Sequence, residues 1–590
     1  MKFKKAICLA GLACIFSTQT GVAQRDTRFS QLPPSSDPFT LAQGRSFSAS
    51  GRDRAGSGNS RKRTITSDVE EALKLVIRNH VTGKRLDRGA LAGSAITGML
   101  HTLDPHSNYY DPDEFQQLLG EHESEYTGTG SSIAGFERDG KLDTYIVSTF
   151  SGSPSAAAGL RFGDRILAVD GRRVSGETPD LVRDLMRGPR GTIVRLTIER
   201  ADGRTVETVE MKRERVHEPA VPKGFLLHGS VGYIDLTNGF SNVTFREFQI
   251  ALDDLKRQGL RSLVLDLRGN GGGILDQAIK VAEKFLPAGT TVLTQRGRGP
   301  ADTRTWKAAK GAHESMPLVL IVDEDSASAS EVLAGALQDN DRALVVGSKT
   351  FGKGLVQSVL NLPEGAGLTL TAARYYTPAG RSIQRDYAAT GLYDYFHHRT
   401  AAEIDKPVYA ARTITNRVMY GGDGITPDEL ADQDRHTPGR SALLDAIFHF
   451  SRDLAGGRLA MNAPTTLTPV QHLRQRIVLN GSIVDEQLVT DFRRFIGGNE
   501  APPSIQAAST SEKAFSRRML EYYLSLAAFG TDLARKVRIE SDPVVQKAVD
   551  ALPRSAELAA EAQRARNSSA RKKKSSPSLI LNEQSRNRRN

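Results

Sequence analysis

The sequence predicts a multidomain protein of mixed α/β and α+β class, and three patterns along its 590 residues carry this prediction. Apolar strand-like runs alternate with helical segments between residues 228 and 377, which indicates an α/β sheet with crossover helices. Short β-type runs separated by Gly-Asp turns, together with one short helix near Pro179–Met186, occupy residues 125–203 and predict a compact α+β module. Helical periodicity precedes residue 119, interrupted by a turn at Leu103-Asp-Pro-His106, and returns after residue 441, so helical segments flank the core.

The first 23 residues have the pattern of a secretory signal peptide. Three lysines precede an apolar run over residues 6–16, and the small residues at 21–23 form a cleavage site. The run is too short to span a bilayer. A lipid anchor at Cys14 is the alternative, although Gly11 stands where such a motif usually has leucine. We therefore expect export to a periplasmic or other extracytoplasmic space, with membrane contact that is peripheral at most.

Cysteine and charge usage exclude several classes of site. The two cysteines, Cys8 and Cys14, both lie in the signal, so the mature chain would have no thiol for a nucleophile, a zinc site or a disulfide. The net charge of +11 resides in the signal and in residues 564–590, which leaves the folded middle close to neutral. No basic patch is interleaved with aromatic residues, so nucleic acid is not an expected partner. No metal or cofactor is expected.

The changes in composition along the chain predict seven segments. They are a signal peptide (1–23), a flexible linker (24–63), an N-terminal helical segment (64–124), the α+β module (125–203), the α/β core (204–440), a C-terminal helical region (441–560) and a basic disordered tail (561–590). Within the core, strands are expected at 231–236, 262–267, 317–322 and 343–346, and helices at 244–258, 274–285 and 329–338. The C-terminal helical region is a candidate surface for an adaptor or a second copy of the chain.

A serine-rich block, Asp325-Ser-Ala-Ser-Ala-Ser-Glu331, lies between a buried strand and an apolar helix. The unpaired N–H groups at such a helix start can stabilise an oxyanion, which favours a nucleophilic serine. The alternative is that these serines only cap the helix.

A glycine-flanked lysine follows the next strand, in Thr350-Phe-Gly-Lys-Gly354. Lys353 would lose solvation in an apolar site, so its pKa would fall and the neutral amine could accept a proton from a serine. A phosphate-binding loop is disfavoured because the residue order differs from that motif. None of the twelve histidines lies between His313 and His397, which agrees with a base other than histidine.

A glycine-rich turn, Asp266-Leu-Arg-Gly-Asn-Gly-Gly-Gly273, follows the predicted strand at 262–267. It lacks the fingerprint of a dinucleotide site. Gly272 or Gly273 could instead offer a backbone N–H to an oxyanion.

Together these three blocks resemble the carboxy-terminal-processing, or tail-specific, protease family, which is the S41-type serine protease family with a PDZ domain. The resemblance covers residues 66–430 and includes Leu103-Asp-Pro-His-Ser107 and the segments 376–384 and 424–428. It implies Ser328 as nucleophile, Lys353 as general base and Gln357 as the residue that positions the lysine. It further implies oxyanion donors at Ala329 and at Gly272 or Gly273, with supporting roles for Glu331 and Asp339.

The module at 125–203 resembles a PDZ domain through Ser153–Leu160 and Gly163–Gly171. Such domains bind an extended C-terminus by strand addition. The candidate binding loop consists of Gly128, Thr129, Gly130, Ser131, Ser132 and Ile133, and its two serines are more polar than the family pattern. The expected partners are therefore protein or peptide substrates with accessible C-termini. Two other hypotheses remain: a non-catalytic scaffold that binds tails, and a serine hydrolase that uses His106 with Asp104.

Overall fold

The computed structural model describes residues 65–121, 125–387, 395–396, 409–431, 438–459, 468, 470–471, 473–474, 482–497 and 510–575. The predicted signal peptide (1–23) and linker (24–63) lie outside these residues. The predicted N-terminal helical segment contains α2 (Ile65–Asn79), α3 (Arg88–His101) and α4 (Pro112–Glu121). The turn expected at residues 103–106 does separate α3 from the strand β1 (Asn108–Tyr110).

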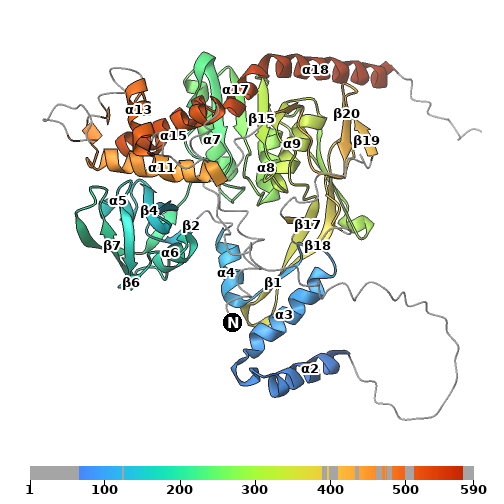
Figure 1. The fold of residues 1–590 in the computed structure, drawn as a ribbon. Helices are drawn as coiled ribbons and strands as arrows, with labels where there is room; N and C mark the ends of the chain where they lie inside the picture. Colours follow the sequence, from blue (N-terminus) through green and yellow to red (C-terminus); the bar gives the residue numbers. More distant parts are fainter. Residues whose placement is uncertain are drawn as a thin grey trace, which may run out of the picture.

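A six-stranded sheet forms the centre of the α/β core (Figure 1). Its order is β10-β11-β12-β15-β16-β21, and all neighbouring pairs are parallel except β10 with β11. The strands are β10 (Phe225–Leu226), β11 (Val231–Asp235), β12 (Ser262–Asp266), β15 (Leu318–Val322), β16 (Leu344–Gly347) and β21 (Glu429–Leu430). The central strands are buried on both faces, which explains why they read as continuous apolar runs in the sequence.

Helices from opposite ends of the chain cover the two faces of this sheet. The crossover helices α7 (Thr244–Arg257), α8 (Leu275–Glu283) and α9 (Ala329–Asp339) pack on one face around Leu263, Leu265 and Leu320. The opposite face carries Val264, Val319 and Ile321, and it is covered by α17 (Pro543–Asp550) and the start of α18 (Leu552–Ser575). The C-terminal region therefore completes the core of the protein. The helix α18 also continues to Ser575, beyond the predicted start of a disordered tail at 561.

A second, antiparallel sheet lies beside the core, and the sequence patterns did not predict it. Its order is β1-β18-β13-β14, with β17 paired to β18. The strands are β13 (Thr291–Gly297), β14 (Arg304–Lys307), β17 (Leu355–Asn361) and β18 (Gly367–Tyr376). A small ribbon of β19 (Tyr409–Arg412) and β20 (Val418–Gly421) follows. Because β17 begins two residues after Lys353, this sheet holds one end of the lysine loop.

The PDZ-like module is a sheet of order β3-β4-β5-β7-β8, with β6 paired to β5. Its elements are β3 (Ser131–Arg138), β4 (Lys141–Thr149), α5 (Pro154–Ala157), β5 (Arg165–Val169), β6 (Arg172–Arg173), α6 (Pro179–Met186), β7 (Ile193–Glu199) and β8 (Val206–Lys212). The helix expected near 179–186 is present. The sheet extends beyond the predicted boundary at 203 because β8 pairs with β7 along its whole length. Strands β2 (Glu125–Gly128) and β9 (Glu214–His217) pair at the point where the chain enters and leaves the module.

The remaining C-terminal helices pack against the PDZ-like module. They are α11 (Pro438–Ala455), α13 (Glu486–Phe495), α15 (Thr510–Phe529) and α16 (Thr531–Glu540). One apolar cluster joins Phe136 and Tyr145 of the module to Phe448 and Tyr523 of the helices. The rings of Phe136 and Phe448 stack with centroids 3.6 Å apart.

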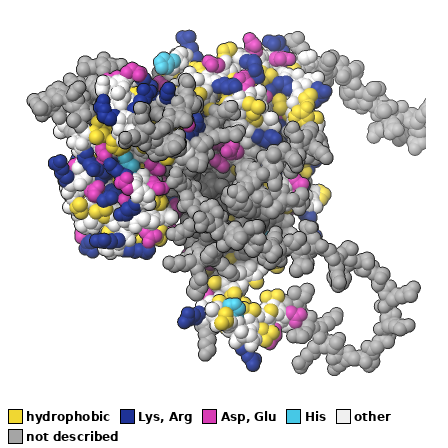
Figure 2. All heavy atoms as spheres, in the orientation of Figure 1, with side chains coloured by type: hydrophobic (Ala, Val, Ile, Leu, Met, Phe, Trp, Pro, Cys, Tyr) yellow, Lys and Arg dark blue, Asp and Glu magenta, His cyan; other side chains and the backbone are white. Residues whose placement is uncertain are grey.

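Acidic and basic side chains are interspersed over the PDZ-like module on the face drawn in Figure 2. This mixture matches the near-neutral charge of the folded middle of the chain. Within the described residues, no helix is both long enough and apolar enough to cross a membrane.

Candidate active site

Ser328 lies at the turn between β15 and α9 and has unusual backbone angles, φ 57° and ψ −114°. A residue that only caps a helix has extended angles, and a positive φ is unfavourable for a residue with a Cβ atom. The strain costs on the order of 1–3 kcal/mol, so the surrounding contacts must impose it. A sharp, strained strand-to-helix turn of this kind is how hydrolases present a nucleophilic serine.

The three serines of the serine-rich block differ in how deeply they are buried. Ser326 and Ser330 are fully buried, and their hydroxyls donate to the carbonyls of Leu267 and Asn270, both at 2.8 Å. Ser328 is partly exposed. The outer two serines therefore hold the turn together, and Ser328 is the serine that a substrate can reach.

The glycine-rich turn, which we call the oxyanion loop (residues 267–273), interlocks with the serine turn. The Asn270 carbonyl accepts the N–H of Ala327 at 2.9 Å. Gly272 has φ 109°, and a Cβ atom placed on it would lie 2.8 Å from the Cβ of Ser328 and 3.1 Å from the nitrogen of Ala329. Only glycine permits this approach of the two backbones.

The structure distinguishes the three predicted oxyanion donors. The Gly272 N–H donates to the Asn270 side chain at 2.8 Å, so it is already used. Phe240 bonds to the residues on either side of Gly273, so in the described part of the chain the N–H of Gly273 itself has no hydrogen-bond partner. The N–H of Ala329 lies in the first turn of α9, where it has no partner within the helix. Ala329 and Gly273 are thus the candidate pair.

Glu331 joins the serine turn to the lysine loop. Its side chain is completely buried, and one carboxylate oxygen accepts the N–H groups of both Ser328 and Lys353, at 2.9 and 2.8 Å. These two backbone nitrogens therefore lie no more than about 6 Å apart. The other oxygen accepts the Thr350 hydroxyl at 2.6 Å and the Gly352 N–H at 2.7 Å. Burial raises the pKa of Glu331, and these hydrogen bonds oppose that increase.

Both glycines beside Lys353 are required by close backbone contacts. Gly352 has φ 90°, and a Cβ atom there would lie 2.8 Å from the Cβ of Arg385. A Cβ atom on Gly354 would lie 2.7 Å from the nitrogen of Gln384. The end of the family motif at 376–384 and the residue after it therefore pack against the lysine loop. Lys353 itself is partly exposed.

Gln357 and His106 lie close to Lys353. The Gln357 amide donates to the His106 carbonyl at 2.6 Å. Burial lowers the pKa of His106 well below its ordinary value, and the nearby charges of Lys353 and Arg385 lower it further. The His106 ring bonds to the Tyr395 hydroxyl at 2.9 Å.

The hypothesis of a His106–Asp104 base does not fit this geometry. One Asp104 oxygen accepts the backbone N–H groups of His106 and Ser107, both at 2.8 Å, and the other accepts the Ser107 hydroxyl at 2.8 Å. These bonds of the Asp104 carboxylate go to the turn and not to the imidazole ring of His106. A histidine-based triad is therefore not assembled there.

An aromatic cluster borders the site and was not predicted from the sequence. The His106 ring contacts the rings of Phe351, Tyr395 and Phe396 edge to face, and Phe351 contacts Tyr395 in the same way. The Arg385 guanidinium lies 4.3 Å from the Phe351 ring centroid. Tyr395 and Phe351 also pack against Ala327, the residue before Ser328. No periodic pattern marks this cluster in the sequence, because its members come from three distant segments.

Asp339 lies at the far end of α9 from Ser328 and makes a buried ion pair with Arg381, at 2.6 Å. Both side chains are fully buried. Asp339 bonds to the segment that follows β18, whereas Glu331 bonds to the serine turn and the lysine loop. Asp339 thus supports the fold and has no direct link to the serine or lysine loops.

The candidate tail-binding loop surrounds the start of β3. Thr129 is buried and its carbonyl accepts the Ser155 N–H at 2.8 Å, while Gly130 has φ 78° and packs against Ser153. Ser131 and Ser132 open β3 opposite Thr149 and Ser148, and Ile133 packs against the module's core. Since β3 is at the edge of its sheet, its outer side is where a strand could be added.

Comparisons with known proteins agree with this architecture. Residues 230–390 match peptidase family S41, and residues 148–200 match the PDZ domain. A carboxy-terminal-processing protease of Bartonella bacilliformis is 39% identical over 303 residues, which cover 50% of this chain and 68% of that protein. A carboxyl-terminal-processing protease of Picosynechococcus sp. is 38% identical over 297 residues, covering 50% of this chain and 70% of that protein.

Among solved structures, a photosystem II D1 C-terminal processing protease is 29% identical and covers 62% of this chain and 92% of its own, with a TM-score of 0.33. The PDZ domain of a carboxy-terminal protease from Vibrio cholerae, in complex with peptide, is 28% identical and covers 16% of this chain and 99% of its own, with a TM-score of 0.14.

The fold and the matches define a serine peptidase of family S41 that carries a PDZ domain. More particularly, the chain belongs to the carboxy-terminal-processing protease family. The hypothesis of a non-catalytic scaffold is therefore not retained.

Proposed function

We propose that this protein is an exported serine endopeptidase in which Ser328 is the nucleophile and Lys353 the general base, and that its PDZ domain selects substrates by their C-terminal tails. The observation that carries the dyad is the shared Glu331 oxygen, which holds the backbones of Ser328 and Lys353 in one hydrogen-bonded unit. Export rests on the sequence of residues 1–23.

The proposed reaction is hydrolysis of an amide by acyl transfer. Neutral Lys353 accepts the proton of the Ser328 hydroxyl, and the alkoxide attacks the scissile carbonyl. The N–H groups of Ala329 and Gly273 stabilise the negative charge on the tetrahedral intermediate. Lys353 then protonates the leaving amine, and it activates the water that hydrolyses the acyl-enzyme. Gln357, fixed by its bond to His106, orients the lysine.

A fluorophosphonate probe is expected to modify the purified protein at Ser328 alone, because Ser326 and Ser330 are buried and hydrogen-bonded. Peptide mapping by mass spectrometry locates the adduct. An adduct on a different serine, or no adduct on an enzyme that hydrolyses casein, contradicts the assignment of the nucleophile.

The PDZ domain is proposed to bind the substrate's C-terminus along β3, beside α6. Pro179 of α6 packs on β3 at Gly135, where a Cβ atom would lie 2.7 Å from the Pro179 ring. This contact closes the far end of the space between strand and helix, so the part of β3 near Ser131 is the part left for a tail. Charge-assisted hydrogen bonds from the backbone of the loop at 128–132 would bind the terminal carboxylate.

Amidation of the substrate's C-terminus is therefore expected to raise KM about 10- to 100-fold, since a hydrogen bond to a charged group contributes roughly 1.5–3 kcal/mol. The measurement compares free-acid and amidated peptides of identical sequence that end in an apolar residue. Equal kcat/KM for the two peptides would contradict tail recognition by the PDZ domain, but it would not bear on the proposed dyad. The C-terminal helical region remains a candidate site for an adaptor or a second copy.

A further inference from the structure

The helices α16 and α17 contact the protease core next to the oxyanion loop. Asp542 is the N-cap of α17: one of its oxygens accepts the Val544 and Val545 N–H groups, at 2.8 and 3.3 Å. Its other oxygen accepts a hydrogen bond from the Arg268 guanidinium at 2.8 Å. The helix itself is anchored, because Val544 and Val545 are buried against the central sheet. Asp542 therefore presents a carboxylate at a fixed position.

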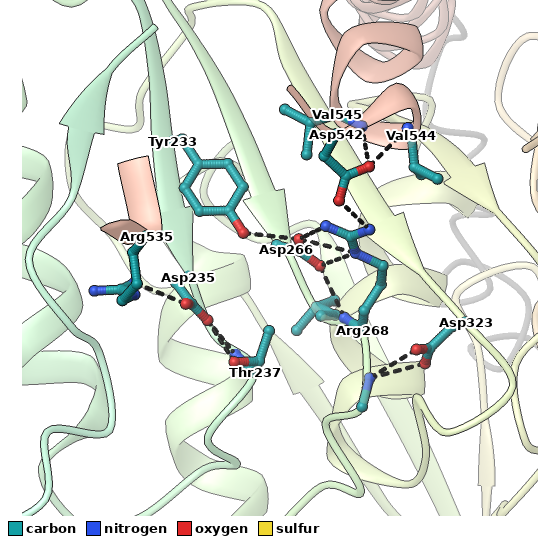
Figure 3. A network of polar contacts seen from close by, with 12 residues as sticks. Tyr233, Asp235, Thr237, Asp266, Arg268, Asp323, Arg535, Asp542, Val544 and Val545 are labelled. Carbon is teal, nitrogen blue, oxygen red and sulfur yellow. Dashed lines mark hydrogen bonds and ion pairs between the residues drawn. The ribbon is translucent and has the colours of Figure 1, made fainter. Parts of the chain in front are cut away.

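Arg268 lies within the oxyanion loop and bridges two carboxylates (Figure 3). Its Nε donates to both oxygens of Asp266 at 3.0 Å, and one terminal nitrogen donates to the same group at 2.5 Å. The Tyr233 hydroxyl also donates to Asp266, at 2.8 Å. Burial alone would raise the pKa of Asp542, but the charge of Arg268 brings it below its ordinary value. The guanidinium is thus clamped between the end of β12 and the start of α17.

The residue after Arg268 connects this clamp to the serine turn. The Gly269 N–H donates to both oxygens of Asp323, at 2.9 and 3.0 Å. Asp323 also accepts the N–H and the hydroxyl of Ser326, at 2.9 and 3.0 Å. The chain then runs through Asn270 to Gly273, the candidate oxyanion donor. Arg268 and this candidate donor therefore lie on one short segment that is bonded to the serine turn.

A second contact supports the same loop from α16. Arg535 donates to Asp235 at 2.7 Å, at the end of β11. The other Asp235 oxygen accepts the Thr237 N–H and hydroxyl, at 2.9 and 2.6 Å. This turn leads to Phe240, which hydrogen-bonds to the residues on both sides of Gly273. The chain after β11 and the chain after β12, which lead to Phe240 and to Gly273, are therefore both bonded to side chains of the C-terminal helices.

We propose that the C-terminal helices are part of the catalytic apparatus: Asp542, acting through Arg268, is a positioning residue that sets the oxyanion loop for reaction at Ser328. The proposal rests on the function proposed above, because it assigns the oxyanion donor to Gly273. It also gives the PDZ domain a physical link to the loop. The same helical region binds that domain through Arg452, which donates to the Gly163 and Arg200 carbonyls, and through Asp445, which accepts the Glu137 N–H of β3.

The test substitutes Asp542→Asn in the full-length mature chain. Asparagine is as good an N-cap as aspartate, so the start of α17 is retained while the charge that holds Arg268 is removed. Asp485→Asn is the matched control, since Asp485 caps α13 in the same region and bonds to Leu488 there. Removal of an oxyanion donor costs about 10²- to 10³-fold in kcat. Displacement of the loop should cost less, so we expect kcat to fall about 10-fold for Asp542→Asn with KM nearly unchanged, and no change for the control.

Hydrogen exchange separates positioning from the chemistry. Amides of the peptide that covers residues 267–273 should exchange faster in Asp542→Asn than in the wild type and the control. Unchanged exchange and a kcat within twofold of the wild type overturn the proposal. If the fluorophosphonate probe does not label Ser328 in the wild type, the proposed nucleophile is refuted. The exchange rates of residues 267–273 would still show whether Asp542 positions the loop. If Asp542→Asn does not fold, Arg268→Lys serves, because a lysine cannot bridge Asp266 and Asp542 together and should show the same kcat loss.

Discussion

Replacement of Ser328 by alanine is expected to reduce the hydrolysis of an unstructured protein by about 10⁴-fold or more, to the limit of detection. The reason is that the nucleophile and its base act as one unit, so loss of the attacking oxygen removes acylation altogether. Ser328 is partly exposed and does not tie the turn together as Ser326 and Ser330 do, so the variant should keep its fold and melting temperature. Two measurements check this: the rate of casein hydrolysis and the melting temperature of the variant.

The same experiment includes two substitutions of the lysine. Lys353→Ala should lower kcat by about 10²- to 10⁴-fold, the usual contribution of a general base. Lys353→Arg should be equally inactive, because a guanidinium keeps its proton and cannot act as a base. A merely structural positive charge would be rescued by arginine. Activity in the arginine variant, or turnover by purified Ser328→Ala, would refute the dyad.

Substitution of Glu331 by glutamine is expected to give the largest effect outside the dyad itself. Each of the two carboxylate oxygens accepts two hydrogen bonds. In glutamine an NH₂ group would replace one of these oxygens and would face two donors. Unsatisfied buried groups cost about 1–3 kcal/mol each, and the cost falls on the contacts that join the serine turn to the lysine loop. We therefore expect kcat to fall about 10- to 100-fold, with slower fluorophosphonate labelling of Ser328.

Asp339→Asn is the matched control for Glu331→Gln. It removes the charge from a fully buried ion pair with Arg381, so it should lower the free energy of unfolding by about 3–5 kcal/mol. Its contacts do not reach Ser328 or Lys353, so the folded fraction should retain its kcat. If both variants lose stability and kcat in the same proportion, Glu331 has no special link to the dyad.

Much of the core could be predicted because its signal is local. The strands at 231–235, 262–266 and 318–322 are buried on both faces, which requires continuous apolar runs that are visible in the sequence. The helix α6 also has local determinants, because Thr178 caps it and a proline stands at its start. The antiparallel sheet of β13, β17 and β18 was missed, since its strands are half-exposed and β18, besides its hairpin with β17, pairs with β13 across a long stretch of chain.

The sequence by itself determined the family and the candidate residues, because short motifs carry these properties in adjacent positions. Only the tertiary structure decided which of those candidates meet. It showed that Glu331 bonds to both loops while Asp339 does not, that Gly272 already donates its N–H, and that Asp542 reaches Arg268 across 274 positions of the chain. The physical reason is that hydrogen bonds and ion pairs act over a few ångströms between residues that folding brings together, and no local pattern records such long-range contacts.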